Sequence, residues 1–89
     1  MKKKVKYVKF LNNDHEEIIF FSECVKHHHF KSFEPISAGF AQFNGESVTC
    51  YGESVSLRLQ TESNDTFVAT KQVFGWEAAE KTTSFATNC

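Results

Sequence analysis

The stretch that decides the fold class is residues 37–52, SAGFAQFNGESVTCYG. Asn44-Gly45 separates two short runs in which apolar and polar residues alternate, and a type I′ hairpin turn needs positive φ at both of its central positions. A two-residue turn here predicts Phe43 opposite Glu46. The alternation sorts the hairpin into two faces. One face holds Phe43, Ala41, Val48 and Cys50, and the other holds Phe40, Gln42, Thr49 and Tyr51.

Three further runs around this hairpin are typical of strands. Residues 4–11 carry lysines on both faces, which favours a sheet edge, where charge discourages unwanted pairing. Residues 16–22 are apolar on both faces, which favours a central strand. Residues 54–60 alternate with Val55, Leu57 and Leu59 inward. Between them, residues 12–15 form a turn, and alternation fails after residue 22, which indicates a bulge there or a break before His27.

One short helix is predicted near residues 64–74. Ser63-Asn64-Asp65 supplies an N-cap, and Gly75 is suited to the C-terminal end. The fold class is therefore α+β, mostly β, with about five antiparallel strands that form a sheet or a small, partly open barrel. Residues 1–76 are expected to make a single β-rich domain. Residues 77–89 are polar without a clear period and are expected to form a flexible tail.

The composition is that of one globular domain. The chain has 89 residues, of which 40% are hydrophobic and 15% aromatic, too apolar for a disordered segment. The longest clean apolar run, residues 18–21, is far shorter than a membrane span. Because no signal-peptide pattern opens the sequence, we expect a cytoplasmic protein whose three cysteines are reduced thiols.

The charge is divided unevenly along the chain. Half of the ten basic residues lie near the start, and residues 10–89 carry the other five against eleven acids, a balance of −6. This balance argues against a general nucleic-acid binder. Lysines interleaved with aromatic rings nevertheless suit single-stranded nucleic acid, which is one alternative function. Its candidate residues are Lys2, Lys3, Lys4, Lys6 and Lys9.

A second alternative is zinc binding. Cys24, His27 and His29 have ligand chemistry in a C-x2-H-x-H spacing, and Cys50 is a candidate fourth ligand. The other reading makes the imidazoles solvent-facing and the thiols small core residues. No nucleophile elbow or Gly-rich oxyanion loop is recognisable, so we predict a non-catalytic protein. We predict no cofactor, with zinc as the alternative.

The leading prediction is a small interaction or oligomerisation module. Aromatic rings on both faces of the strands need cover, and one helix covers only one face of a sheet. An uncovered apolar patch on a small domain usually marks an interface. We therefore expect Tyr7, Phe40 and Tyr51 to form a surface that binds another copy or a protein partner, and we expect no membrane partner. No motif in the chain identifies a named family.

Overall fold

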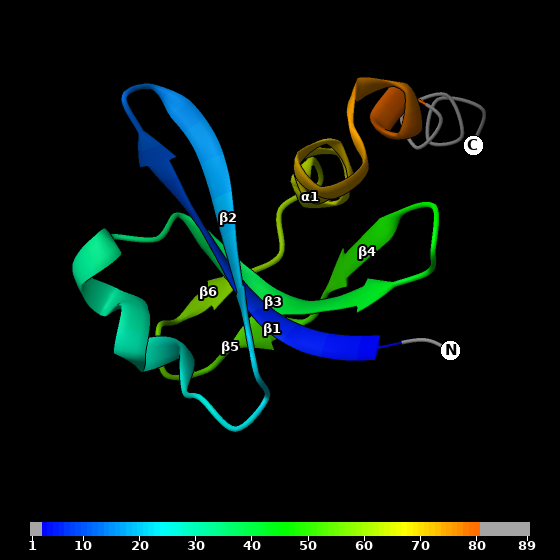
Figure 1. Ribbon diagram of the computed structural model, residues 1–89. Helices are drawn as coiled ribbons and strands as arrows, with labels where there is room; N and C mark the ends of the chain where they lie inside the picture. The colour runs from blue at the N-terminus through cyan, green and yellow to red at the C-terminus, as the bar shows by residue number, and fades with distance from the viewer. Residues whose placement is uncertain (1–2, 81–89) are drawn as a thin grey trace.

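The computed structural model describes the backbone of residues 3–80 and the side chains of residues 4–80. Its elements are β1 (Lys3–Asn12), β2 (His15–Phe21), the 3₁₀ helix η1 (His27–Phe33), β3 (Ser37–Phe43), β4 (Val48–Tyr51), β5 (Glu53–Ser54), β6 (Leu59–Gln60) and α1 (Asp65–Phe74). Residues 76–80 are also helical. The mostly β fold with one helix near residues 64–74 is thus confirmed (Figure 1).

The main sheet has four antiparallel strands in the order β2-β1-β3-β4. It is open rather than a closed barrel. Two sequence-based positions were wrong, because β1 is a central strand and β2 an edge strand. Alternation reports which face a side chain occupies and carries no information on strand order. The central strand β1 accommodates its lysines because each described ammonium has a partner: Lys4 lies over the Phe40 ring, Lys6 bonds the Val25 carbonyl and Lys9 pairs with Asp65.

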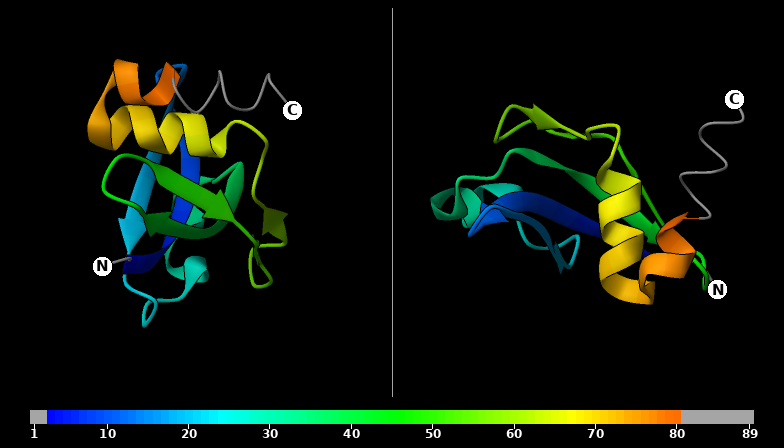
Figure 2. Two further views of the ribbon diagram at one scale, coloured as in Figure 1. Left: turned by 90° about the vertical axis from the view of Figure 1, so that its right-hand side faces the viewer. Right: turned by 90° about the horizontal axis from the view of Figure 1, so that it is seen from above.

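One face of the sheet packs against α1. The core on this side contains Val5, Tyr7, Ile18, Ala41, Val48, Cys50 and, from the helix, Ala69. Phe20 and Phe43 pack against it with ring centroids 5.1 Å apart. In both views of Figure 2, α1 and η1 lie at opposite sides of the molecule. On the second face, which includes buried Val8, the His27 ring of η1 packs against Phe21 and Phe40, so η1 covers this face.

Helix α1 also covers the outer edges of both edge strands. The Thr70 hydroxyl accepts from the Val48 N–H of β4 at 3.0 Å and donates to its carbonyl at 3.1 Å. At the other edge, the Gln72 side-chain amide accepts from the Ile18 N–H of β2 at 2.8 Å and donates to its carbonyl at 2.7 Å. The sheet curls enough to bring β2 and β4 to the same helix, which lies between them in Figure 1. The helix thereby spans the opening that a closed barrel would have sealed with strand pairing.

The central hairpin keeps its predicted faces but not its predicted register. Phe43 pairs with Val48 and Ala41 with Cys50, because the loop is two residues longer than expected. A shift of two residues leaves every side chain on its original face, since strand periodicity is two. The tight turn with positive φ at both central residues occurs instead at Asn13 (53°) and Asp14 (69°), between β1 and β2.

The predicted strand at residues 54–60 was wrong. Only β5 and β6 pair, and residues 55–58 form the turn between them, with Val55 81% exposed. This small hairpin packs against β3 at Gly39. A Cβ atom at Gly39 would lie 2.5 Å from the Tyr51 carbonyl oxygen and 2.6 Å from Thr61 Oγ1. The absence of a side chain there allows this close approach.

The helical region extends beyond the predicted domain boundary. Helix α1 begins after Asn64 and ends before Gly75, close to the predicted limits, and residues 76–80 are again helical, with Ala79 fully buried. The first part of the predicted tail is therefore packed, and its remainder lies outside the described residues. The break before His27 is also found, since β2 ends at Phe21 and η1 begins at His27. None of the helices described in residues 3–80 is both long and apolar enough to cross a bilayer.

Candidate functional site

A continuous row of aromatic rings crosses the face of the sheet that η1 covers. In spatial order the rings belong to Phe10, Phe33, Phe30, Phe21, His27, Phe40 and Tyr51, with neighbouring centroids 4.4–6.0 Å apart. Among these rings only His27 is buried, Phe10, Phe21, Phe30 and Phe40 are half-buried, and Phe33 and Tyr51 are 47% and 38% exposed. Rings of η1 thus cover part of the second face of the sheet, which α1 does not reach.

We define the ring surface as Lys4, Phe40 and Tyr51, at one end of this row. Phe40 and Tyr51 are cross-strand partners on β3 and β4, and their rings stack with centroids 5.9 Å apart and planes 28° apart. The Lys4 ammonium lies 4.7 Å from the centroid of the Phe40 ring. Lys4 and Tyr51 are exposed and Phe40 is half-buried. Two of the three predicted surface residues, Phe40 and Tyr51, therefore lie together at solvent.

Tyr7 does not belong to this surface and is a correction. Its side chain is fully buried on the α1 face of the sheet. The Tyr7 hydroxyl donates to Asp65 Oδ2 at 2.5 Å and lies 2.9 Å from Thr61 Oγ1. Burial, reinforced by the hydrogen bond to the Asp65 carboxylate, raises the pKa of Tyr7 well above its ordinary value. Tyr7 is therefore a neutral hydrogen-bond donor of the interior.

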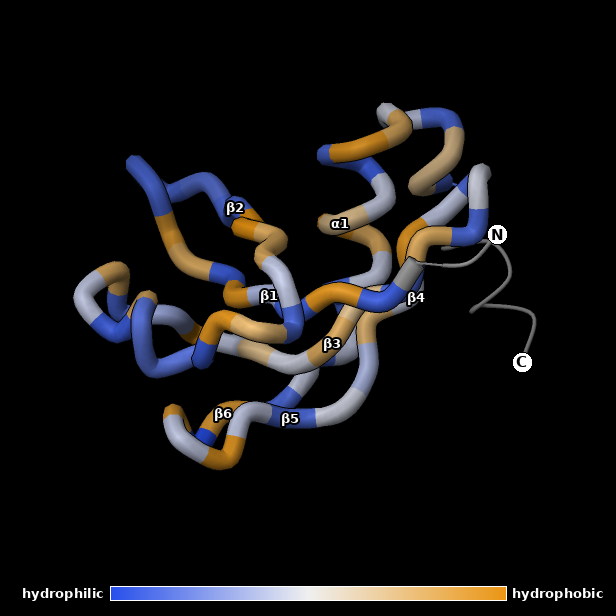
Figure 3. The backbone as a smooth tube through the Cα atoms, turned by 60° about the horizontal axis from the view of Figure 1, so that its bottom comes forward, coloured by the Kyte–Doolittle hydropathy of each residue, from blue (hydrophilic) through white to orange (hydrophobic). Residues whose placement is uncertain are grey.

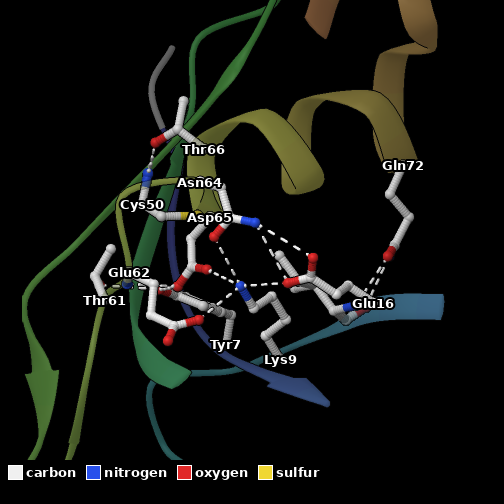
Figure 4. Close-up of polar contacts among 11 residues, drawn as sticks. Tyr7, Lys9, Glu16, Cys50, Thr61, Glu62, Asn64, Asp65, Thr66 and Gln72 are labelled. Atoms are coloured by element: carbon white, nitrogen blue, oxygen red, sulfur yellow. Dashed lines mark hydrogen bonds and ion pairs between the residues drawn. The ribbon is translucent and has the colours of Figure 1, made fainter. Parts of the chain in front are cut away.

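Lys9 is likewise buried, at the centre of a polar cluster beneath the start of α1. Its ammonium lies 2.6 Å from Asp65 Oδ1, 2.7 Å from Glu16 Oε2 and 2.9 Å from Glu62 Oε1. It also donates to Asn64 Oδ1 at 3.0 Å. Figure 4 shows these groups converging on the Lys9 ammonium from the β2 side and the α1 side. Lys9 cannot contact nucleic acid, which corrects its place among the predicted nucleic-acid residues.

The charge of Lys9 is retained despite burial. Burial alone lowers the pKa of Lys9, but the hydrogen bonds to Asp65, Glu16 and Glu62 outweigh this effect, and the net pKa lies above its ordinary value. An amine whose pKa is raised in this way is a poor general base, because almost none of it is deprotonated near neutral pH. The cluster is suited to fixing the start of α1 on the sheet.

The remaining predicted nucleic-acid lysines are dispersed. The Lys6 ammonium donates to the Val25 carbonyl at 3.0 Å, and its side chain is half-buried. Lys4 is exposed on the ring surface. Lys2, and the side chain of Lys3, lie outside the described residues. Within the described side chains, only Lys4 of this set combines exposure with an aromatic contact.

The predicted zinc ligands are not brought together. Cys24 is exposed, whereas Cys50 is buried on the α1 face. His27 lies on the opposite face, where its Nε2 atom is 2.8 Å from the Gly39 carbonyl oxygen, and His29 is exposed. Across residues 3–80, no group of three or more His, Cys, Asp or Glu side chains could hold a metal ion.

The buried thiol of Cys50 has little nucleophilic character. Burial, with a further contribution from the charge of Asp65, raises its pKa to about 12. A thiol with this pKa is protonated at neutral pH, and the thiolate is the reactive form. Cys50 therefore acts as a small apolar core residue.

One feature that sequence reasoning missed is a groove between the outer edge of β2 and α1. It has a volume of about 690 Å³. Its β-side wall contains Asp14, Glu16 and Glu17, and its helical wall contains Phe67, Val68 and Gln72. Figure 3 shows the turn between β1 and β2 and the start of β2 as hydrophilic. The acids at residues 14, 16 and 17 were visible in the sequence, but only the tertiary structure shows that α1 packs beside them.

No family model matches the chain, and no curated protein or solved structure is detectably similar to it.

Proposed function

We infer that the chain is a cytoplasmic, non-catalytic interaction module that associates with a second copy of itself or with another protein through the ring surface. The supporting observation is the exposed stack of Tyr51 on Phe40 with the Lys4 ammonium beside it. Aromatic and cationic side chains are enriched at protein interfaces, where rings bury a large area at a small cost in side-chain entropy. The exposed thiol of Cys24 fits a reducing compartment.

Self-association is the first case to test. We expect sedimentation velocity of the full chain at micromolar concentrations to show a dimer or larger species. Tyr51→Ser should shift this species to monomer, because it removes the outer ring of the stack. Val55→Ser is the matched control, since Val55 is 81% exposed but lies at the tip of the β5–β6 hairpin. A monomer at every concentration would exclude self-association, and an equal effect of both variants would exclude the ring surface.

The same surface has a second candidate ligand, single-stranded nucleic acid, favoured by the stacked rings beside Lys4. A labelled single strand distinguishes the two functions. Nucleic-acid binding predicts retention at low salt that falls as salt rises and weakens in Lys4→Gln. Self-association predicts a dimer whose stability changes little over the same salt range, because ring contacts are mostly apolar. Retention of the strand without any dimer would replace the protein-interaction proposal.

A further inference from the structure

The Asn44-Gly45 pair lies in the exposed loop between β3 and β4, which projects from one end of the sheet in Figure 1. Gly45 has a φ of 89°, and a Cβ atom at this position would meet nothing within 4 Å. Among the described residues, none accepts a hydrogen bond from the Gly45 N–H. The Gly45 nitrogen is therefore open to water, and no side chain of its own hinders it.

The carboxamide of Asn44 is the group that this nitrogen can reach within the chain. Three atoms link its carbon, Cγ, to the Gly45 nitrogen, so a bond between the two closes a five-membered ring. The Asn44 N–H donates to the Ser47 carbonyl at 2.9 Å, whereas Nδ2 donates to Thr49 Oγ1 at 3.2 Å in an exposed contact. An exposed hydrogen bond competes with water and contributes little. The backbone of Asn44 is thus fixed, while its carboxamide is free to rotate toward Gly45.

Asn64, which precedes α1, shows the opposite arrangement. Its carboxamide oxygen accepts from the buried Lys9 ammonium at 3.0 Å. The next nitrogen in the chain, that of Asp65, donates to the Glu62 carbonyl at 3.1 Å and begins the helix. Both groups that ring closure at Asn64 would need are therefore engaged. Of these two asparagines, the structure leaves only Asn44 ready to react.

We propose that Asn44 is a site of spontaneous covalent modification, at which the Gly45 nitrogen attacks the Asn44 carboxamide carbon and forms a succinimide that water then opens. The bond between the Gly45 nitrogen and Asn44 Cγ forms, and the Cγ–Nδ2 bond breaks. The proton lost from the Gly45 N–H passes through water to the departing nitrogen, which leaves as ammonia. Addition of water at Cγ gives aspartate, and addition at the main-chain carbonyl gives isoaspartate.

Both products change the charge of the loop. Each places a carboxylate at position 44, two positions before Glu46 in the same loop. Isoaspartate also adds one methylene to the loop backbone. Because the paired residues Phe43 and Val48 close the sheet behind the loop, we expect both changes to stay confined to its tip. The site shares no residue with the ring surface, so this proposal and the proposed function succeed or fail separately.

The test follows the full-length chain during incubation at pH 8 and 37 °C. We expect the tryptic peptide of residues 32–58, whose only asparagine is Asn44, to gain the mass difference between an amide and an acid. Electron-transfer fragmentation should assign isoaspartate and aspartate at position 44. Asn64, in the peptide of residues 59–71, should remain an amide over the same period.

Three outcomes would overturn the proposal. An unchanged Asn44 in the folded chain, while the chain unfolded in urea converts, would show that the loop protects it. Equal conversion of Asn44 and Asn64 would show that the fold does not select between them. Aspartate without any isoaspartate would exclude the succinimide.

Three variants connect the reaction to the loop geometry. Gly45→Ala places a methyl group beside the attacking nitrogen and should slow conversion about tenfold, which corresponds to about 1.4 kcal/mol in the barrier. Gly75→Ala is the matched control, since Gly75 also combines a positive φ with open space, and it should leave the rate at Asn44 unchanged. Thr49→Val removes the acceptor of Asn44 Nδ2 and should speed conversion about two- to fivefold, the scale of one ordinary hydrogen bond. Equal rates in the two alanine variants would contradict attack by the Gly45 nitrogen.

Discussion

The ammonium group of Lys9 lies 2.6 Å from the carboxylate of Asp65, and both side chains are fully shielded from solvent. The first comes from the centre of the sheet and the second from the first residue of α1. Two more carboxylates, from Glu16 and Glu62, complete the cluster at the surface side. The pair connects the sheet to the helix that covers its α1 face.

Loss of Lys9 should be costly, since it leaves a buried carboxylate without its counter-charge. We expect Lys9→Met to reduce the free energy of unfolding by about 3–5 kcal/mol. Lys9→Met combined with Asp65→Asn should recover part of this loss, because no unpaired charge then remains inside. Glu62→Gln is the control and should cost less than about 1 kcal/mol, since Glu62 is 49% exposed. Urea unfolding measures all of these values, and equal costs for Lys9→Met and Glu62→Gln would contradict the buried-pair interpretation.

Thr70 should be more important to stability than an average helix residue, because its buried hydroxyl bonds both outward groups of Val48. Thr70→Val keeps the shape and removes the hydroxyl, which leaves the N–H and carbonyl of Val48 without this partner. We expect a loss of about 1–3 kcal/mol in the free energy of unfolding. The comparison variant is Val73→Thr on the same helix, whose side chain is exposed and whose substitution should be nearly neutral. A stability for Thr70→Val equal to that of the unaltered chain would show that the edge of β4 needs no cover.

Acid should destabilise the fold through His27. Burial lowers the pKa of His27 below 6.5; the hydrogen bond to the Gly39 carbonyl opposes this effect, and the positive charge of Lys6 adds a smaller lowering. Below pH 6.5 the unfolded chain therefore binds a proton at this residue that the folded chain does not. Stability from this group is complete above pH 6.5 and declines as the pH falls from there toward the lower folded pKa.

Urea midpoints between pH 7.5 and 5 measure this effect. We expect His27→Leu to lose part of the pH dependence seen in the unaltered chain. His28→Gln, at the exposed neighbouring position, should retain it. Identical pH profiles for the unaltered chain and His27→Leu would rule out His27 as the origin.

The described cysteines should differ sharply in reactivity. Iodoacetamide at neutral pH should alkylate exposed Cys24 within the folded protein and leave Cys50 unmodified, because the Cys50 thiol is buried and its pKa is raised to about 12. In urea, both should react at similar rates. Peptide mapping by mass spectrometry distinguishes the sites, and rapid labelling of Cys50 under native conditions would indicate that the α1 face opens readily.

The sequence by itself determined the local features of this protein. Periodicity of two assigned Phe43, Ala41, Val48 and Cys50 to a common face, and this assignment survived a register error because the error was two residues. The limits of α1 were close to those predicted: Gly75 ends the helix with its N–H bonded to the Lys71 carbonyl, whereas Asn64 precedes the first turn without a side-chain capping hydrogen bond. The same alternation placed Phe40 and Tyr51 together on the other face, because both belong to one hairpin.

Tertiary structure alone decided the strand order, the burial of Tyr7 and Lys9, and the groove beside β2. Each depends on groups far apart in the chain, such as Lys9 with Asp65 and Ile18 with Gln72. Sequence patterns place a lysine at the surface because it is charged. Its burial is tolerated only when folding brings carboxylates around its ammonium. Strand order likewise follows from the packing of whole faces and edges, for which alternation within one strand contains no signal.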